Sequence, residues 1–131
     1  MSNVLFPTPA SSTIQLDWGH TGLLTSGARY ISRGQSGTDS ATLLPTRITR
    51  AGVARNLSVI VTTGPGAART DTWAVMKNGV ATGLTVSLVG AAVSGVSTVP
   101  VAFVPGDTIA MRQTTEALST SANVQVTVDF D

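Results

Sequence analysis

The side chains with the greatest capacity for acid–base chemistry are few in this sequence and lie apart. The single histidine, His20, follows Asp17 by three residues in the segment DWGH, where an imidazole could act as a general base or a metal ligand. One histidine in a chain without cysteine does not form the usual zinc site, and His20 lies in an irregular part of the chain. We therefore expect neither catalysis nor a metal centre at His20.

The carboxylates show no spacing that indicates a site. None of them follows the pattern of a calcium-binding loop, and Asp107 is explained by the Pro-Gly-Asp turn in which it lies. A pair of acids could still meet in space, as glycosidases require. We expect neither enzymatic activity nor a cofactor. A small hydrolase is kept as a hypothesis that ranks below two structural ones given below, and alanine substitutions at His20, Asp17 and Asp107 would test it.

Arginine forms the only basic concentration, at Arg29, Arg33, Arg47, Arg50 and Arg55, with Tyr30 close by. Interleaved arginine and aromatic residues can contact nucleic acid, but a formal net charge of +1 and 11% charged residues fall short of the usual basic footprint. Arginine is also favoured at protein interfaces, where its planar fork pairs with carboxylates. We therefore predict a protein partner and no nucleic acid.

The two tryptophans differ in their surroundings. Trp73 lies at strand spacing and is expected in the core, whereas Trp18 lies in the irregular N-terminal part and is the better candidate for an anchor in a neighbour's pocket. The predicted partner-binding residues are Trp18, Arg29, Tyr30, Arg33, Arg47 and Arg50.

Length and composition indicate one domain outside the membrane. A chain of 131 residues suits a single hydrophobic core, and the absence of cysteine removes disulfides as a source of stability. The start, MSNVLFPTPASS, has no basic segment before an apolar one, and no 18 apolar residues run together. We expect synthesis in the cytoplasm and no membrane partner.

Apolar residues alternate with period two along most of the chain, which predicts an all-β fold. The clearest elements are a hairpin over 70–88 and a final strand over 122–131 inside a sheet. Asn78-Gly79 supplies the two positive φ angles of the hairpin turn, and Gly83 indicates a bulge or a longer, irregular tip. Pro45 and Pro100 indicate sheet edges. We expect seven or eight strands in a jelly-roll or β-sandwich. Further strands are expected over 41–50, 55–63, 98–104 and 108–115, with loops at 64–69, 90–97 and 116–122.

The first 40 residues have a different character, rich in Pro, Ser, Thr and Gly with short apolar islands. We expect residues 1–40 to form an extended N-terminal arm that contacts a partner, and residues 41–131 to form the sandwich domain. The alternative is an extra strand that folds back onto its own domain.

The succession of strands and turns from Arg55 to Phe130 resembles the jelly-roll domains of the tumour necrosis factor and complement-head type. These recur as trimeric capsid decoration proteins and fibre heads of tailed bacteriophages. The likeness covers roughly residues 41–131 and is carried by the turns Lys77-Asn78-Gly79 and Pro105-Gly106-Asp107. It implies a homotrimer and supplies no catalytic residue. The chain lacks the Gly-X-Y repeat and the heptads of a fibre shaft, which favours a compact protein on a shell.

The function expected from the sequence is therefore that of a virion structural protein on the outer capsid surface. It would trimerise, bind the major capsid protein through its arm and stabilise the shell. The alternative is a receptor-binding head of a phage fibre that binds a host-surface glycan through its loops. On the first hypothesis, a version lacking residues 1–35 folds but no longer binds capsids.

Overall fold

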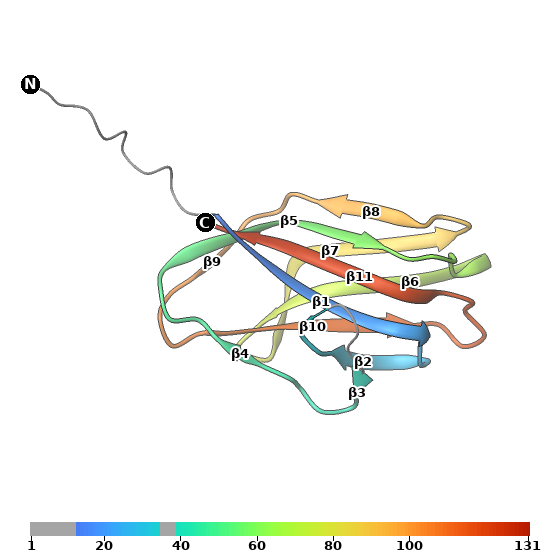
Figure 1. Cartoon of the computed structure of the whole chain (residues 1–131), viewed down its shortest axis with the longest axis horizontal. Coiled ribbons are helices and arrows are strands. Elements are labelled where there is room, and N and C mark those ends of the chain that lie inside the picture. The colour runs from blue at the N-terminus through green and yellow to red at the C-terminus, as the bar shows by residue number, and fades with distance from the viewer. Residues whose placement is uncertain (1–12, 35–38) are drawn as a thin grey trace, which may run out of the picture.

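The computed structural model describes residues 13–34 and 39–131, which form two antiparallel β-sheets packed face to face (Figure 1). The all-β sandwich predicted from the alternating pattern is confirmed. The finer jelly-roll assignment stays a prediction.

The first sheet has the strand order β1-β11-β5-β8, and β9 pairs with the other half of β5 along the same edge as β8. Its strands are β1 (Ile14–Leu23), β5 (Gly52–Ile60), β8 (Ser94–Ser97), β9 (Val101–Phe103) and β11 (Ala122–Phe130). Every pair is antiparallel.

The second sheet has the order β3-β2-β10-β6-β7, and the short β4 also pairs with β10. Its strands are β2 (Gly27–Ile31), β3 (Asp39–Ser40), β4 (Thr46–Arg47), β6 (Gly66–Lys77), β7 (Val80–Gly90) and β10 (Thr108–Thr115). The described residues thus hold eleven strands, where the sequence predicted seven or eight.

The core lies between the sheets because each strand turns its alternate apolar residues inward. Leu57 and Val59 of β5 face Leu84 and Val86 of β7, and Trp73 is fully buried as predicted. Burying one leucine or valine side chain stabilises the fold by about 2 kcal/mol. In β11, Val124, Val126, Val128 and Phe130 are buried, which confirms a final strand pinned between neighbours.

The β6–β7 hairpin turns as its sequence predicts. Asn78 and Gly79 have φ angles of 52° and 78°, the positive values that a two-residue hairpin turn requires. Pairing then shifts between Ala74↔Thr85 and Met76↔Ala81, so the residues around Gly83 form the expected bulge.

Three local predictions were wrong. The loop predicted over 64–69 is shorter than expected, because β6 begins at Gly66. The strand predicted over 41–50 is reduced to the two residues of β4, because Pro45 has no N–H for a ladder and the chain pairs with β10 only beyond it. The loop predicted over 90–97 contains β8, where Gly95 lets the backbone approach β7. A Cβ on Gly95 would lie 2.8 Å from Val86 Cγ1.

The arm assigned to residues 1–40 also needs correction where the structure describes it. Residues 14–23 form β1, and residues 27–31 form β2, so the alternative of strands folded onto their own domain holds for this part. The cause is the alternation of Leu16, Trp18 and His20, which turns these side chains toward the other sheet. Residues 1–12 lie outside the described residues.

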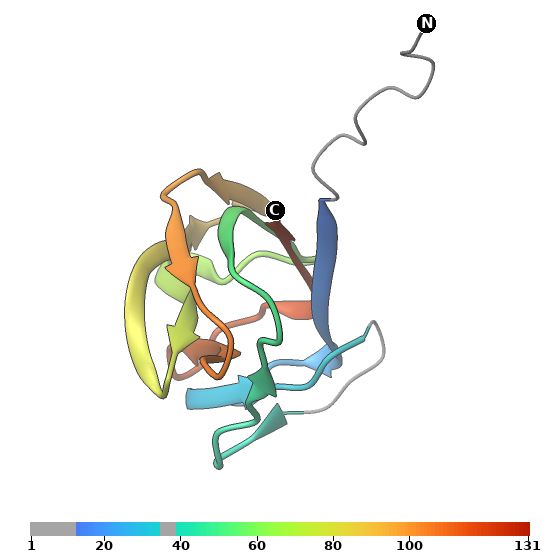
Figure 2. The ribbon, with the colours of Figure 1, turned by 90° about the vertical axis from the view of Figure 1, so that its left-hand side faces the viewer.

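The sandwich has two sides and two ends. On one side lie the edges formed by β1 and β3, and on the other lie the edges formed by β7 and by β8 with β9. Figure 2 looks onto the end where β1 begins and the C-terminus lies, and the loop between β10 and β11 lies at the opposite end, on the right of Figure 1.

Candidate functional site

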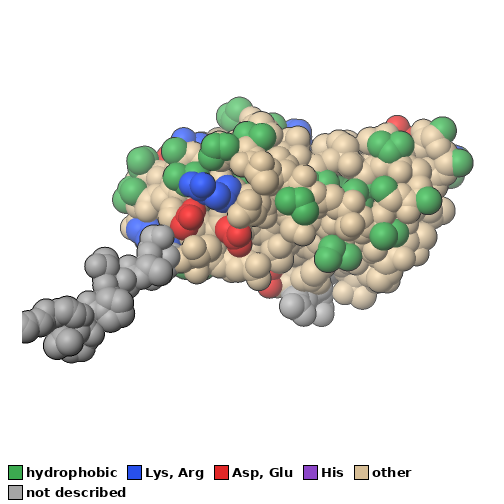
Figure 3. Space-filling view, turned by 90° about the horizontal axis from the view of Figure 1, so that it is seen from above, with side chains coloured by type: hydrophobic (Ala, Val, Ile, Leu, Met, Phe, Trp, Pro, Cys, Tyr) green, Lys and Arg blue, Asp and Glu red, His purple; other side chains and the backbone are tan. Residues whose placement is uncertain are grey.

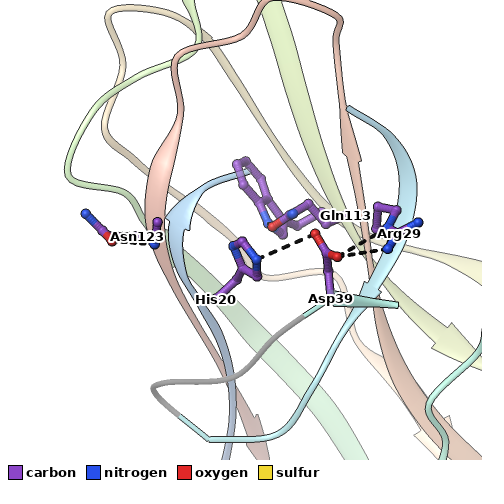
Figure 4. A network of polar contacts seen from close by, with 7 residues as sticks. His20, Arg29, Asp39, Gln113 and Asn123 are labelled. Carbon is purple, nitrogen blue, oxygen red and sulfur yellow. Dashed lines mark hydrogen bonds and ion pairs between the residues drawn. The ribbon is translucent and has the colours of Figure 1, made fainter. Parts of the chain in front are cut away.

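Charged side chains from three strands meet on the side formed by β1 and β3 (Figure 4). Arg29 of β2 donates to Asp39 of β3 with a nitrogen–oxygen distance of 3.0 Å, and His20 Nε2 of β1 lies 3.6 Å from the other Asp39 oxygen. The Asp39 side chain is only 8% exposed. This ion cluster therefore ties the edges of the two sheets together.

Burial raises the pKa of Asp39, but hydrogen bonds from Thr25 and Arg29 and the charges of Arg29 and His20 outweigh it. The net result is a pKa below the ordinary 3.8. Asp39 is therefore ionised at neutral pH, and its role here is to hold the cluster together.

Polar side chains continue inward from the ion cluster. Trp73 Nε1 donates to Gln113 Oε1 at 2.9 Å, and both residues are fully buried. Trp18 Nε1, His20 Nδ1 and Gln113 Nε2 are buried without a hydrogen-bond partner among the described residues. Such groups mark a place where a buried water can bind.

The three residues of the hydrolase hypothesis lie in separate surroundings. Asp17 accepts a bond from Arg33 through its backbone oxygen, and His20 faces Asp39. Asp107 binds Asn78, the Val104 N–H and Lys77, and hydrogen bonding by Asn78 and Val104 lowers its pKa. Within residues 13–34 and 39–131, no three potential metal-binding side chains gather.

Trp18 does not have the position predicted for an anchor. It is completely buried in the protein's own core, where it pairs in register with Val126. Arg33 covers it from outside, with its guanidinium 5.2 Å from the ring centre and its Nε bonded to the Asp17 oxygen. Trp18 therefore supports the fold, and any partner would meet Arg33.

The remaining predicted residues are spread over the molecule and form no single patch. Arg29 is paired with Asp39, and Tyr30 lies half-buried on β2. Arg47 pairs with Thr108 and Arg29 with Gln113 of β10, which separates the two by about 17 Å along the strand, and Arg50 follows Arg47 by three residues. The sequence cluster therefore divides between two regions.

Arg47 and Arg50 border a pocket of about 160 Å³. The pocket is lined by Ile14, Leu16, Thr46, Arg47, Ile48, Thr49, Arg50 and Phe130. Arg50 stacks over the Phe130 ring at 5.5 Å, while Arg47 is exposed. The two arginines thus frame a mainly apolar hollow, which the sequence did not predict.

The opposite side of the sandwich carries no charge over a long stretch. Residues 78–106 contain no Asp, Glu, Lys, Arg or His, and they supply β7, β8 and β9. Among the described residues, six of the ten exposed large apolar side chains lie here: Val80, Val89, Val93, Val96, Val99 and Val104. Figure 3 looks onto this side, where charged residues gather mostly at one end. We call it the uncharged side.

Sequence analysis missed the uncharged side, although the signal was present. The stretch without charge was visible, but it could not be placed on one surface without knowing that β7 and β8, in different sheets, lie side by side.

The three segments predicted as loops of a receptor-binding head do come together, although residues 66–69 and 94–97 belong to β6 and β8. Thr120 N donates to the Pro65 oxygen at 2.9 Å, Arg69 Nε donates to the Ala117 oxygen, and Gly66 pairs with Gly90. They form one end of the sandwich.

Models of protein families give no match to this sequence, and curated proteins show no significant sequence similarity to it. In the described parts of the chain, no helix has the length and hydropathy to cross a membrane. The surface features themselves must therefore suggest the function.

Proposed function

We propose that this protein is a structural component of a virus particle: a decoration protein that forms homotrimers and stabilises a phage capsid from outside. The observation that carries the self-assembly is the uncharged side. The shell and the phage setting come from the resemblance of the 41–131 segment to trimeric jelly rolls.

The uncharged side has the chemistry of a surface that becomes covered. Val89 and Val96 are 57% and 67% exposed, and no described charged residue lies within the strands that present them. Depletion of charged residues is typical of the buried centre of protein interfaces. A second copy offers the same chemistry, because neither surface then leaves a charge without a partner.

Backbone groups favour the same conclusion. β7 spans Val80–Gly90 and ends its sheet, so no described strand pairs with its outer edge. Natural proteins protect such edges with Lys, Pro or β-bulges; β7 has a bulge near Gly83, but between the bulge and Gly90 it contains neither Lys nor Pro. Covering this edge in an assembly removes the risk of open-ended pairing.

On this proposal, the capsid protein binds the opposite side, which is formed by β1 and β3. It carries Arg33, which is exposed, and the partly exposed Arg29 and Tyr30. Many copies, each with a modest contact, together raise the free energy needed to open a shell.

The self-assembly is tested by placing a charge on the uncharged side. We expect the wild-type chain to have three times its mass of 13.4 kDa in light scattering at micromolar concentration, and Val96→Asp to be monomeric with unchanged circular dichroism. Burying an unpaired carboxylate in an interface costs several kcal/mol.

Leu23→Asp is the matched control, because Leu23 is similarly exposed but belongs to β1 on the other side. It should leave the mass unchanged. A wild-type monomer, or a trimeric Val96→Asp variant, would contradict self-assembly through this side. Shell binding is tested separately by sedimentation with capsids.

The alternative function is a receptor-binding head, which the meeting of the segments 64–69, 90–97 and 116–122 at one end of the sandwich favours. A glycan array distinguishes the two: saturable binding by the isolated protein, without affinity for capsids, supports the head.

A further inference from the structure

The loop between β10 and β11 is built on a buried carboxylate. Asp71 of β6 is fully buried and accepts hydrogen bonds from the Glu116 N–H at 3.0 Å and from Ser119 Oγ at 2.6 Å. The Ser119 N–H also donates to the Glu116 oxygen, which closes the turn. The loop over 116–121 is therefore preorganised.

A second set of bonds fixes this loop to the neighbouring one. Thr120 Oγ1 donates to the Gly64 oxygen at 2.7 Å, its N–H donates to the Pro65 oxygen, and Arg69 Nε donates to the Ala117 oxygen. Bonds on both sides of residue 118 thus determine where its side chain points.

Leu118, at the tip, is the residue that this framework presents. It is 79% exposed, more than any other large apolar side chain described, and its φ angle is +66°. A leucine in the left-handed region costs about 1 kcal/mol or more, and here no burial within the chain offsets that cost. Glycine or asparagine would fit the backbone better, so the leucine points to a contact outside the chain.

A matching pocket lies at the other end of the molecule. β11 runs from this loop to Phe130, which lines the 160 Å³ pocket together with Ile14, Leu16 and Ile48. An apolar cavity of about 150 Å³ holds a benzene molecule, so the pocket is large enough for a leucine side chain. Exposed Glu116 beside Leu118 complements exposed Arg47 at the pocket.

We propose that Leu118 of one copy occupies the pocket of a second copy, with Glu116 of the first facing Arg47 of the second. Leu118 cannot reach the pocket of its own chain, because about 30 Å of strand β11 separates the loop from the pocket. The contact is head-to-tail, so it closes into a ring or continues as a filament. It rests on the proposed self-assembly but uses a surface distinct from the uncharged side.

Cross-linking tests the pair directly, since the chain contains no cysteine and any disulfide must join introduced residues. Two full-length variants, Leu118→Cys and Ile14→Cys, are mixed and oxidised at micromolar concentration. We expect a mixed disulfide dimer to form at least tenfold faster than in the control mixture of Leu23→Cys and Ile14→Cys. Leu23 is an exposed leucine outside the loop.

A charge reversal gives a second readout. Glu116→Arg and Arg47→Glu, each in the cysteine background, should slow cross-linking, and combining both reversals should restore it. Leu118→Gly should abolish self-association at this contact while leaving the melting temperature equal or higher, because glycine relieves the positive φ.

Several outcomes would overturn the proposal: a cross-linking rate equal to the control, dimers that join only Leu118→Cys to itself, or no restoration by the double reversal. Cross-linking that appears only after removal of residues 1–12 would assign the pocket to that segment instead. Oxidation traps the Leu118 contact covalently even when the contact is too transient to change the mass in light scattering. The mass of the Val96→Asp variant therefore tests the uncharged side and the cross-linking rate tests the Leu118 contact, so failure of one proposal is distinguishable from failure of the other.

Discussion

Asp39 illustrates how one residue supports the side of the sandwich formed by β1 and β3. It receives Arg29 from its own sheet and His20 from the facing sheet, so its carboxylate links strands distant in sequence. The pKa of Asp39 is lowered because these hydrogen bonds and neighbouring positive charges favour the ionised carboxylate.

Replacing Asp39 by asparagine should reduce stability by about 1–2 kcal/mol at neutral pH, because hydrogen bonds to a charged group are lost. The folded-state pKa of Asp39 lies below its unfolded value, so the carboxylate stabilises the fold above the unfolded pKa of 3.8, and this stabilisation disappears as pH falls through the folded pKa. Urea unfolding of both chains between pH 7 and pH 2 measures it. A difference that stays constant across this range would contradict the assignment.

Trp18 shows why residue type alone misleads. An aromatic side chain in a segment rich in Ser, Thr and Gly suggests an anchor, but whether it faces a partner or the core depends on which strand its segment pairs with. Here β1 pairs with β11, which turns Trp18 inward.

Among the elements, β8 depends on a single glycine. It belongs to the first sheet but packs against β7 of the second, and the two approach closely at Gly95.

Gly95→Ala should therefore destabilise the protein by about 1–3 kcal/mol, because the new methyl group would lie 2.8 Å from Val86 and 3.2 Å from Leu88. The matched control is Gly83→Ala, whose Cβ would lie 3.7 Å from Val99, an ordinary contact. We expect that variant to change stability by less than about 0.5 kcal/mol. If Gly95→Ala and Gly83→Ala lowered the melting temperature equally, a close approach of β8 to β7 at Gly95 would be contradicted.

At the scale of the whole molecule, the N-terminal strands belong to the core. The sequence suggested that residues 1–35 could be removed without unfolding the domain, but this range includes β1 and β2, and removing them would expose the surface that Trp18 and Ile31 bury.

We therefore expect a chain lacking residues 1–35 to lose cooperative unfolding and near-ultraviolet circular dichroism. A chain lacking residues 1–12 should keep both, because every described strand remains. Native-like melting of the chain that lacks residues 1–35 would contradict the conclusion that β1 and β2 belong to the core. Capsid binding by the chain lacking residues 1–12 would locate the shell contact on the sandwich itself.

Local patterns by themselves determined many of the strands of this protein. Period-two alternation placed β5, β6, β7, β10 and β11, and Asn78-Gly79 defined the hairpin turn, because both depend on residues close together in the chain.

Tertiary structure decided everything that depends on which strands become neighbours. Only the pairing of β1 with β11, and the approach of β7 to β8, gathers the ion cluster on one side and the uncharged surface on the other. The meeting of Asp71 with the Leu118 loop is decided in the same way. Contacts between such distant residues follow from the packing of whole sheets, which no short stretch of sequence encodes.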